Sequence, residues 1–175
     1  MGKYKTPAEM MDDLWFRPHN SEVTGEMIQQ AWRETRVPPH ILLSVMGAET
    51  SLGDPKLGGD LIRYGSHNYG CMKAGPKTTP WGALADGTVV VAGKTWFTFP
   101  DVETGVRALA LLLAKGPSHK PGYYARCFRN NTGWMRDFAL VYYGANVTGL
   151  GDYIRNLTTL DAKFRSTAAR YGWRW

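Results

Sequence analysis

Residues 39–51 read PHILLSVMGAETS, and this segment decides the fold. It is apolar nearly all round, which is typical of a helix buried in a core rather than one lying on a surface. Pro39 suits the first turn of such a helix, because the N–H group that proline lacks would be unpaired there anyway. Gly53 is expected to end the helix. The sequence therefore predicts a buried helix at the centre of the domain.

One acid interrupts this apolar segment. Ile41, Val45 and Glu49 are spaced at i, i+4 and i+8, so Glu49 shares a helix face with aliphatic residues. Desolvation disfavours the charged form of a carboxyl, and a helix C-terminus carries partial negative charge of its own. Both effects raise a pKa, as a general acid working near neutral pH requires. The alternative is a carboxylate that simply reaches solvent at a fraying helix end.

The chain before residue 39 predicts two further helices. Residues 1–20 form an N-terminal extension in which an apolar cluster predicts a short helix followed by a loop. Ser21 and Thr24 offer N-caps for the next helix, which a Val-Pro-Pro segment stops after Arg36. The apolar cluster consists of Met10, Met11, Leu14, Trp15 and Phe16. The residues at helical spacing in the second helix are Val23, Met27, Ala31 and Trp32.

Residues 53–100 differ in composition, with frequent Gly and Pro. Residues 88–92 and 95–99 are rich in β-branched and aromatic side chains around Gly93, which predicts a hairpin or a small three-stranded lobe. Helices are then expected over residues 102–114, capped by Asp101, over 134–143 and over 152–170. The predicted fold class is mainly α (α+β), a single domain over residues 1–175 with a β lobe and cleft loops inserted after the buried helix.

Composition limits the classes of function. The chain has 175 residues, 43% of them hydrophobic, which suits one domain with a sizeable core. Its net charge of +6 favours polyanions or anionic cell surfaces. The longest apolar run, residues 108–114, is too short to span a bilayer, and the N-terminus shows no signal peptide, so we expect no membrane insertion. Two cysteines cannot build a disulfide framework, although Cys71 and Cys127 could pair.

Three other functions find little support. Residues 87–95 have the wrong spacing for a phosphate-binding loop, and no helix is expected after them. The four histidines are dispersed without acidic partners at ligand spacing, so we expect no metal site and no cofactor. Lys and Arg are scattered rather than gathered on one stripe, so nucleic acid is not an expected partner.

Two segments carry a family resemblance. Residues 48–53, AETSLG, followed by residues 68–73, NYGCMK, resemble the lysozyme-like superfamily of peptidoglycan glycosidases. Within it they are most similar to bacterial cell-wall β-N-acetylglucosaminidases and lytic transglycosylases. Cys71 departs from the usual loop by standing between Gly70 and Met72. Residues 96–105 and 142–154 are also similar to family motifs, so the resemblance covers about residues 38–165.

The resemblance implies a lysozyme-like helical domain and roles for particular residues. Glu49 would be the catalytic acid at the end of its helix. The substrate-binding residues would be Ser51, Asn68, Tyr69, Trp96 and Tyr142. Trp81 and Tyr143 also fall near the expected cleft, where aromatic rings could stack on sugars. For each aromatic residue a core position is the alternative, and Asn68 could equally be a turn residue.

Glycosidases commonly use two carboxylates, so a second acid is needed. The glucosaminidases usually carry this second acid in the β lobe, but residues 88–99 contain no Asp or Glu. Asp86 is the best substitute by position, ahead of Asp54, Asp60, Asp101 and Glu103. Alternatively, Glu49 could suffice if the N-acetyl group or the 6-hydroxyl of the substrate completed the reaction.

The expected function is therefore cleavage of the β-1,4 glycan backbone of bacterial peptidoglycan by a glucosaminidase-type hydrolase. A muramidase or lytic transglycosylase on the same fold is the alternative enzyme. A non-catalytic wall-binding or virion structural protein is the alternative of another class. The expected context is a monomeric phage endolysin or tail-associated lysin that acts on the cell wall, with glycan strands and other virion or tail proteins as partners.

Overall fold

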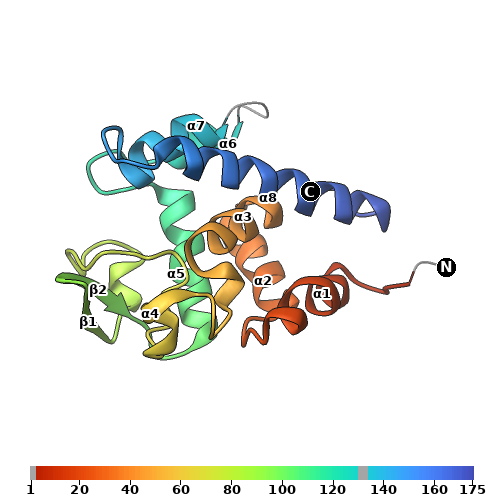
Figure 1. The fold of residues 1–175 in the computed structure, drawn as a ribbon, viewed down its shortest axis with the longest axis horizontal. Helices are drawn as coiled ribbons and strands as arrows, with labels where there is room; N and C mark the ends of the chain where they lie inside the picture. Colours follow the sequence, from red (N-terminus) through yellow and green to blue (C-terminus); the bar gives the residue numbers. More distant parts are fainter. Residues whose placement is uncertain (1–2, 130–133) are drawn as a thin grey trace.

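The computed structural model describes residues 3–129 and 134–175. This part of the chain is mainly helical with one antiparallel pair of strands, which confirms the predicted mainly α (α+β) class (Figure 1). The helices are α1 (Pro7–Met11), α2 (Gly25–Thr35), α3 (Pro39–Thr50), α4 (Gly59–Arg63), α5 (Val102–Lys115), α6 (Tyr123–Arg129), α7 (Trp134–Ala139) and α8 (Leu150–Arg170). The strands are β1 (Gly87–Val91) and β2 (Lys94–Thr98). None of the described helices is long and apolar enough to cross a membrane.

The predicted buried helix is α3. Nearly all of its residues up to the last turn are buried, and Pro39 lies in its first turn as expected. The prediction that Gly53 ends the helix is wrong, because Ser51 and Leu52 already adopt left-handed φ angles of 49° and 61°. The chain therefore turns away immediately after Thr50, which leaves Glu49 in the last turn of the helix.

Helix α8 packs along α3 more extensively than any other helix does. A Cβ added to Gly47 would lie 3.1 Å from a methyl carbon of Leu160, so glycine allows the two helices to approach closely. His40 and Asp161 lie opposite each other in this interface, both buried, with Nδ1 and Oδ1 2.6 Å apart. A buried polar pair of this kind fixes the register between two apolar helix faces.

The N-terminal segment belongs to the same core. Met10, Met11, Trp15 and Phe16 are all buried, across α1 and the π-helical turn Asp12–Phe16 that follows it. The Trp15 ring meets the ring of Phe164 on α8 edge to face, with 4.7 Å between the centroids. The segment expected as an N-terminal extension therefore contributes directly to the packing of α8 through Trp15.

The strands form the predicted hairpin. Gly87 pairs with Thr98 and Val91 with Lys94, which leaves Ala92 and Gly93 as a two-residue turn. Both turn residues have positive φ, 50° and 71°, as a type I′ turn requires. An isolated bridge between Lys73 and Trp96 joins the loop before the hairpin to β2. The hairpin, this loop and α4 form a lobe at one side of the helices (Figure 1).

The C-terminal helices differ in part from the prediction. Asp101 caps α5 as expected, its carboxylate accepting a hydrogen bond from Thr104 N at 2.7 Å. The helix predicted over residues 134–143 instead ends at Ala139 and continues as the π-helical turn Leu140–Gly144. Such wider turns occur often at functional sites, and this one brings Tyr142 and Tyr143 to the cleft described below.

The His40–Asp161 pair gives a test of this packing. Asp161→Ala should lower the free energy of unfolding by about 2–4 kcal/mol, because it leaves a buried imidazole without its partner. The matched control is Asp152→Ala on the same helix, where an exposed pair with Arg155 should be worth less than about 0.5 kcal/mol. Denaturant unfolding measures both variants. Equal losses would show that the buried pair does not hold the two helices together.

Candidate active site

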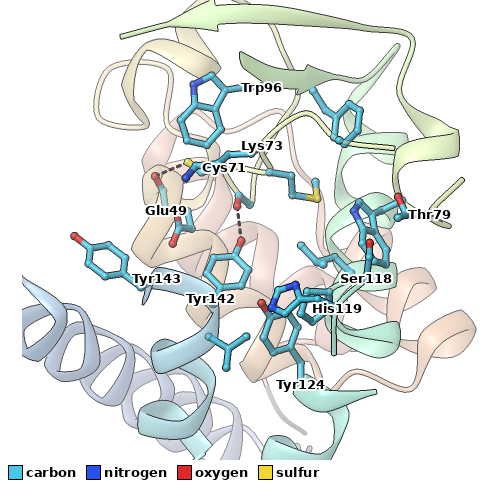
Figure 2. A pocket seen from close by; sticks show the side chains of 18 of the residues that line it. Glu49, Cys71, Lys73, Thr79, Trp96, Ser118, His119, Tyr124, Tyr142 and Tyr143 are labelled. Carbon is cyan, nitrogen blue, oxygen red and sulfur yellow. Dashed lines mark hydrogen bonds between the residues drawn. The ribbon is translucent and has the colours of Figure 1, made fainter. Parts of the chain in front are cut away.

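A cleft of about 660 Å³ lies between the lobe and the helices. Figure 2 shows Glu49 between Trp96 and Lys73 on the lobe side and Tyr142 and Tyr143 on the helical side. The residues that line the cleft are Glu49, Gly70, Cys71, Met72, Lys73, Gly75, Pro76, Thr79, Trp81, Lys94, Trp96, Phe97, Leu112, Pro117, Ser118, His119, Tyr124, Val141, Tyr142, Tyr143 and Val147. Aromatic and polar side chains thus surround one carboxylate.

Glu49 lies in an environment that favours its neutral form. Its side chain is partly buried in the last turn of α3. Burial raises the pKa of the Glu49 carboxyl above its ordinary value of 4.5, and hydrogen bonding from Tyr153 only partly opposes this. The Tyr153 hydroxyl donates to Glu49 Oε1 at 2.6 Å. The carboxyl is therefore held in one orientation and retains its proton more strongly than a free glutamic acid does.

Three tyrosines from the C-terminal helices support this side of the cleft. Tyr153 on α8 stacks on Tyr143, with ring centroids 4.5 Å apart and an angle of 18° between the planes. Tyr142 stacks on Phe138 and donates its hydroxyl hydrogen bond to the carbonyl of Gly70. Burial raises the pKa of both Tyr142 and Tyr153, so their hydroxyls remain hydrogen-bond donors at neutral pH.

Cys71 faces the end of α3. Its thiol donates a weak hydrogen bond to the backbone carbonyl of Glu49 at 3.7 Å (Figure 2). Burial and the nearby Glu49 carboxyl raise the pKa of the Cys71 thiol, which keeps it neutral. Cys71 and Cys127 are both free thiols, so they do not pair with each other. The residue that departs from the family motif thus lies against the candidate acid.

Three residues expected to bind substrate lie outside the cleft. Asn68 is fully buried, and its side chain donates to the carbonyls of Met72 and Phe97 at 2.9 Å and accepts from Met72 N at 2.8 Å. Its amide is used to hold the lobe loop and cannot reach a ligand. Tyr69 is buried and lines a separate, smaller pocket. Ser51 points towards the carbonyl of Leu57 instead of the cleft.

Asp86 is also outside the cleft. It lies exposed beside the hairpin, where its carboxylate accepts a hydrogen bond from the Thr98 hydroxyl at 2.8 Å. The other acids weighed as partners are engaged elsewhere: Asp54 with His19 and two backbone amides, Asp60 with Arg63, Asp101 at its cap and Glu103 with Gln30. Among residues 3–129 and 134–175, Glu49 is the only carboxylate that lines the cleft.

The other expected residues do meet at one site. Trp96, Tyr142, Tyr143 and Trp81 all line the cleft together with Glu49. Sequence reasoning missed Tyr153 as a partner of the acid, because the helical periodicity of α8 marks it only as a core residue. It also missed three residues that line the cleft, Lys73, Lys94 and His119, although Lys73 ends the NYGCMK segment.

The site offers little to a metal ion. Within the described part of the chain, no three His, Cys, Asp or Glu side chains are grouped so that they could hold one. The Glu49 carboxyl instead contacts a tyrosine hydroxyl and a thiol that stays protonated. The arrangement is suited to proton transfer by one carboxyl group.

The raised pKa of Glu49 makes a prediction about stability. Between pH 4.5 and the folded-state pKa, the native protein holds a proton that the unfolded chain has lost, so stability falls as pH rises. Glu49→Gln removes the charge, and its amide oxygen can still accept the Tyr153 hydrogen bond. The variant should therefore unfold at a higher temperature than the original protein near pH 8. This advantage should shrink towards pH 4, and an advantage that is the same at every pH would contradict the raised pKa.

Comparison of the chain with protein-family models, with curated proteins and with solved structures found no match.

Proposed function

We propose that this protein cleaves the β-1,4 glycan backbone of bacterial peptidoglycan, with Glu49 as the general acid. The observation that carries the proposal is the raised pKa of Glu49, the one carboxyl that lines the aromatic cleft among the described residues. The motif over residues 48–53 supports it, because the resemblance to lysozyme-like glycosidases assigns the acid to this position. A helical domain with a small β lobe beside the cleft is also what that resemblance implies.

The first step is proton transfer from Glu49 to the glycosidic oxygen. Oε1 accepts the Tyr153 hydrogen bond, which leaves Oε2 to carry the acidic proton. As the bond between C1 and the glycosidic oxygen breaks, the leaving sugar keeps the proton as a hydroxyl group. Glu49 becomes a carboxylate and the sugar ring acquires oxocarbenium character.

The second step needs a nucleophile, and Glu49 is the only carboxylate that lines the cleft in the described part of the chain. We infer that the substrate supplies it. Attack of the acetamido oxygen on C1 gives an oxazolinium ion, which water then opens while the Glu49 carboxylate takes a proton from the water. Attack of the 6-hydroxyl instead gives a 1,6-anhydro sugar, and Glu49 takes the hydroxyl proton. Either route returns Glu49 to its acid form.

The cleft walls suit aminosugars. Trp96 lies on the lobe side and Tyr142 and Tyr143 on the helical side, and rings of this kind stack on the apolar faces of pyranoses (Figure 2). The indole N–H of Trp96 donates to the carbonyl of Val91 at 3.3 Å, which fixes the plane of the ring against the hairpin. A glycan chain in the cleft would therefore pass between two aromatic walls with Glu49 between them.

The turbidity of a purified cell-wall suspension measures the activity. Glu49→Gln should lower the rate of clearing by about 10²–10⁴-fold, because it removes the acid without changing the shape of the site. Asp86→Asn is the matched control, since Asp86 is an exposed acid outside the cleft and should keep nearly the full rate. A rate unchanged by Glu49→Gln would rule out Glu49 as the acid.

Two further results would identify the reaction. Mass spectrometry of the released fragments distinguishes reducing N-acetylglucosamine ends, reducing N-acetylmuramic acid ends and anhydro ends. A reducing end indicates the acetamido route, and an anhydro end indicates the 6-hydroxyl route. Binding of the original protein to walls without any clearing would instead favour the non-catalytic alternative, a wall-binding or virion structural protein.

A further inference from the structure

Two lysines face the cleft from the lobe. Lys73 is bridged to Trp96, and side chains of directly opposed residues on neighbouring strands point to the same face. Lys94 is two residues before Trp96 on β2, so it shares that face as well. All three line the cleft, and both lysines are exposed. Trp96 on the lobe wall thus has one lysine across the bridge and another two residues along its own strand.

Neither lysine is neutralised by the protein. Within residues 3–129 and 134–175, no salt bridge includes Lys73 or Lys94. Some basic side chains elsewhere are paired, for example Arg33 with Glu26 and Arg107 with Glu34. The only carboxylate that lines the cleft in the described part of the chain is Glu49, whose burial favours the neutral form. The lobe wall of the cleft therefore carries positive charge without a matching negative group.

We propose that Lys73 and Lys94 bind anionic groups carried by the glycan next to the sugar that stacks on Trp96. This inference rests on the proposed function and names the part of the substrate that the lobe recognises. The anions are the carboxylates of the peptide stems or the phosphates of a polymer attached to the glycan. An uncharged glycan of the same backbone, such as chitin, would fill the aromatic part of the cleft and leave both ammonium groups in water.

The alternative is that both lysines only keep the hairpin soluble. A solvated lysine would contribute equally to every substrate, whereas a lysine that binds an anion contributes only where the anion is present. Charge pairs at exposed sites are each worth about 0.2–1 kcal/mol and weaken as salt is added. The two readings therefore differ in their dependence on substrate charge and on ionic strength.

Binding tests the proposal separately from catalysis. The Glu49→Gln protein is incubated with intact cell walls, with walls freed of phosphate polymers by hydrofluoric acid, with peptide-free glycan and with chitin, and bound protein is measured by sedimentation. Adding Lys73→Gln and Lys94→Gln together should weaken binding to intact walls by about 10-fold at low salt. The same pair should leave binding to chitin unchanged. Loss of the effect after hydrofluoric acid treatment identifies the anion as phosphate, and its persistence on the treated walls and absence on chitin identify it as carboxylate.

The matched control removes the same charge elsewhere. Lys56 and Lys163 are exposed and lie outside the cleft, so replacing both with Gln should change binding to intact walls by less than about 2-fold. An equal loss in the control, or a loss of the same size on chitin, would overturn the proposal. Absence of cleavage by the original protein would contradict the proposed function, while the binding series would still decide the role of the two lysines.

Discussion

The structure depends on the packing of α3 against α8. The two helices run antiparallel, since the start of α3 meets the later part of α8 at His40–Asp161 and its end meets the earlier part at Tyr153–Glu49. Between these two polar contacts the interface is apolar and close, with Leu160 against Gly47. Burial of this interface supplies the stabilisation, and the polar contacts select one register. That register places the Tyr153 hydroxyl on the Glu49 carboxyl.

In the described part of the chain, the candidate site contains one acid, which this packing places at the cleft. Glu49 lies at the end of α3, where its partly buried carboxyl meets a thiol and a tyrosine hydroxyl. The acids near the lobe are held outside the cleft by a cap, a hydroxyl or a surface ion pair. A second ionised carboxylate in the cleft would also raise the pKa of the first by repulsion. Here burial raises the pKa of Glu49 without a second carboxylate. The lobe wall carries lysines where such a carboxylate could have been.

The fold could be predicted where the sequence pattern is long and periodic. The buried helix, the capped α5 and the last helix follow from their apolar spacing and caps, and the hairpin follows from β-branched residues around Gly93. The short helices α4 and α6 could not be predicted, because five to seven residues are too few to show a period. The end of α3 was misplaced because Ser51 and Leu52 adopt left-handed φ angles that residues other than glycine rarely take.

The candidate site could be predicted only in part. Glu49 stands out as an acid on an apolar helix, and Trp96 and Tyr142 were expected beside it. Asn68 has the polarity of a ligand, but its amide is used by three backbone hydrogen bonds, a role that only the folded loop reveals. The contact between Tyr153 and Glu49 spans 104 positions in the chain and has no local signature.

The central claim is that Glu49 keeps its proton in the folded protein at a pH where a free glutamic acid has lost it. The most direct measurement is a ¹³C NMR titration of the glutamate side-chain carboxyls, with the Glu49 resonance identified by its absence from the Glu49→Gln variant. The account predicts that this resonance titrates above 4.5, the ordinary pKa of glutamic acid. Titration at or below that value would mean that the carboxyl is ionised in the cleft and cannot serve as the acid.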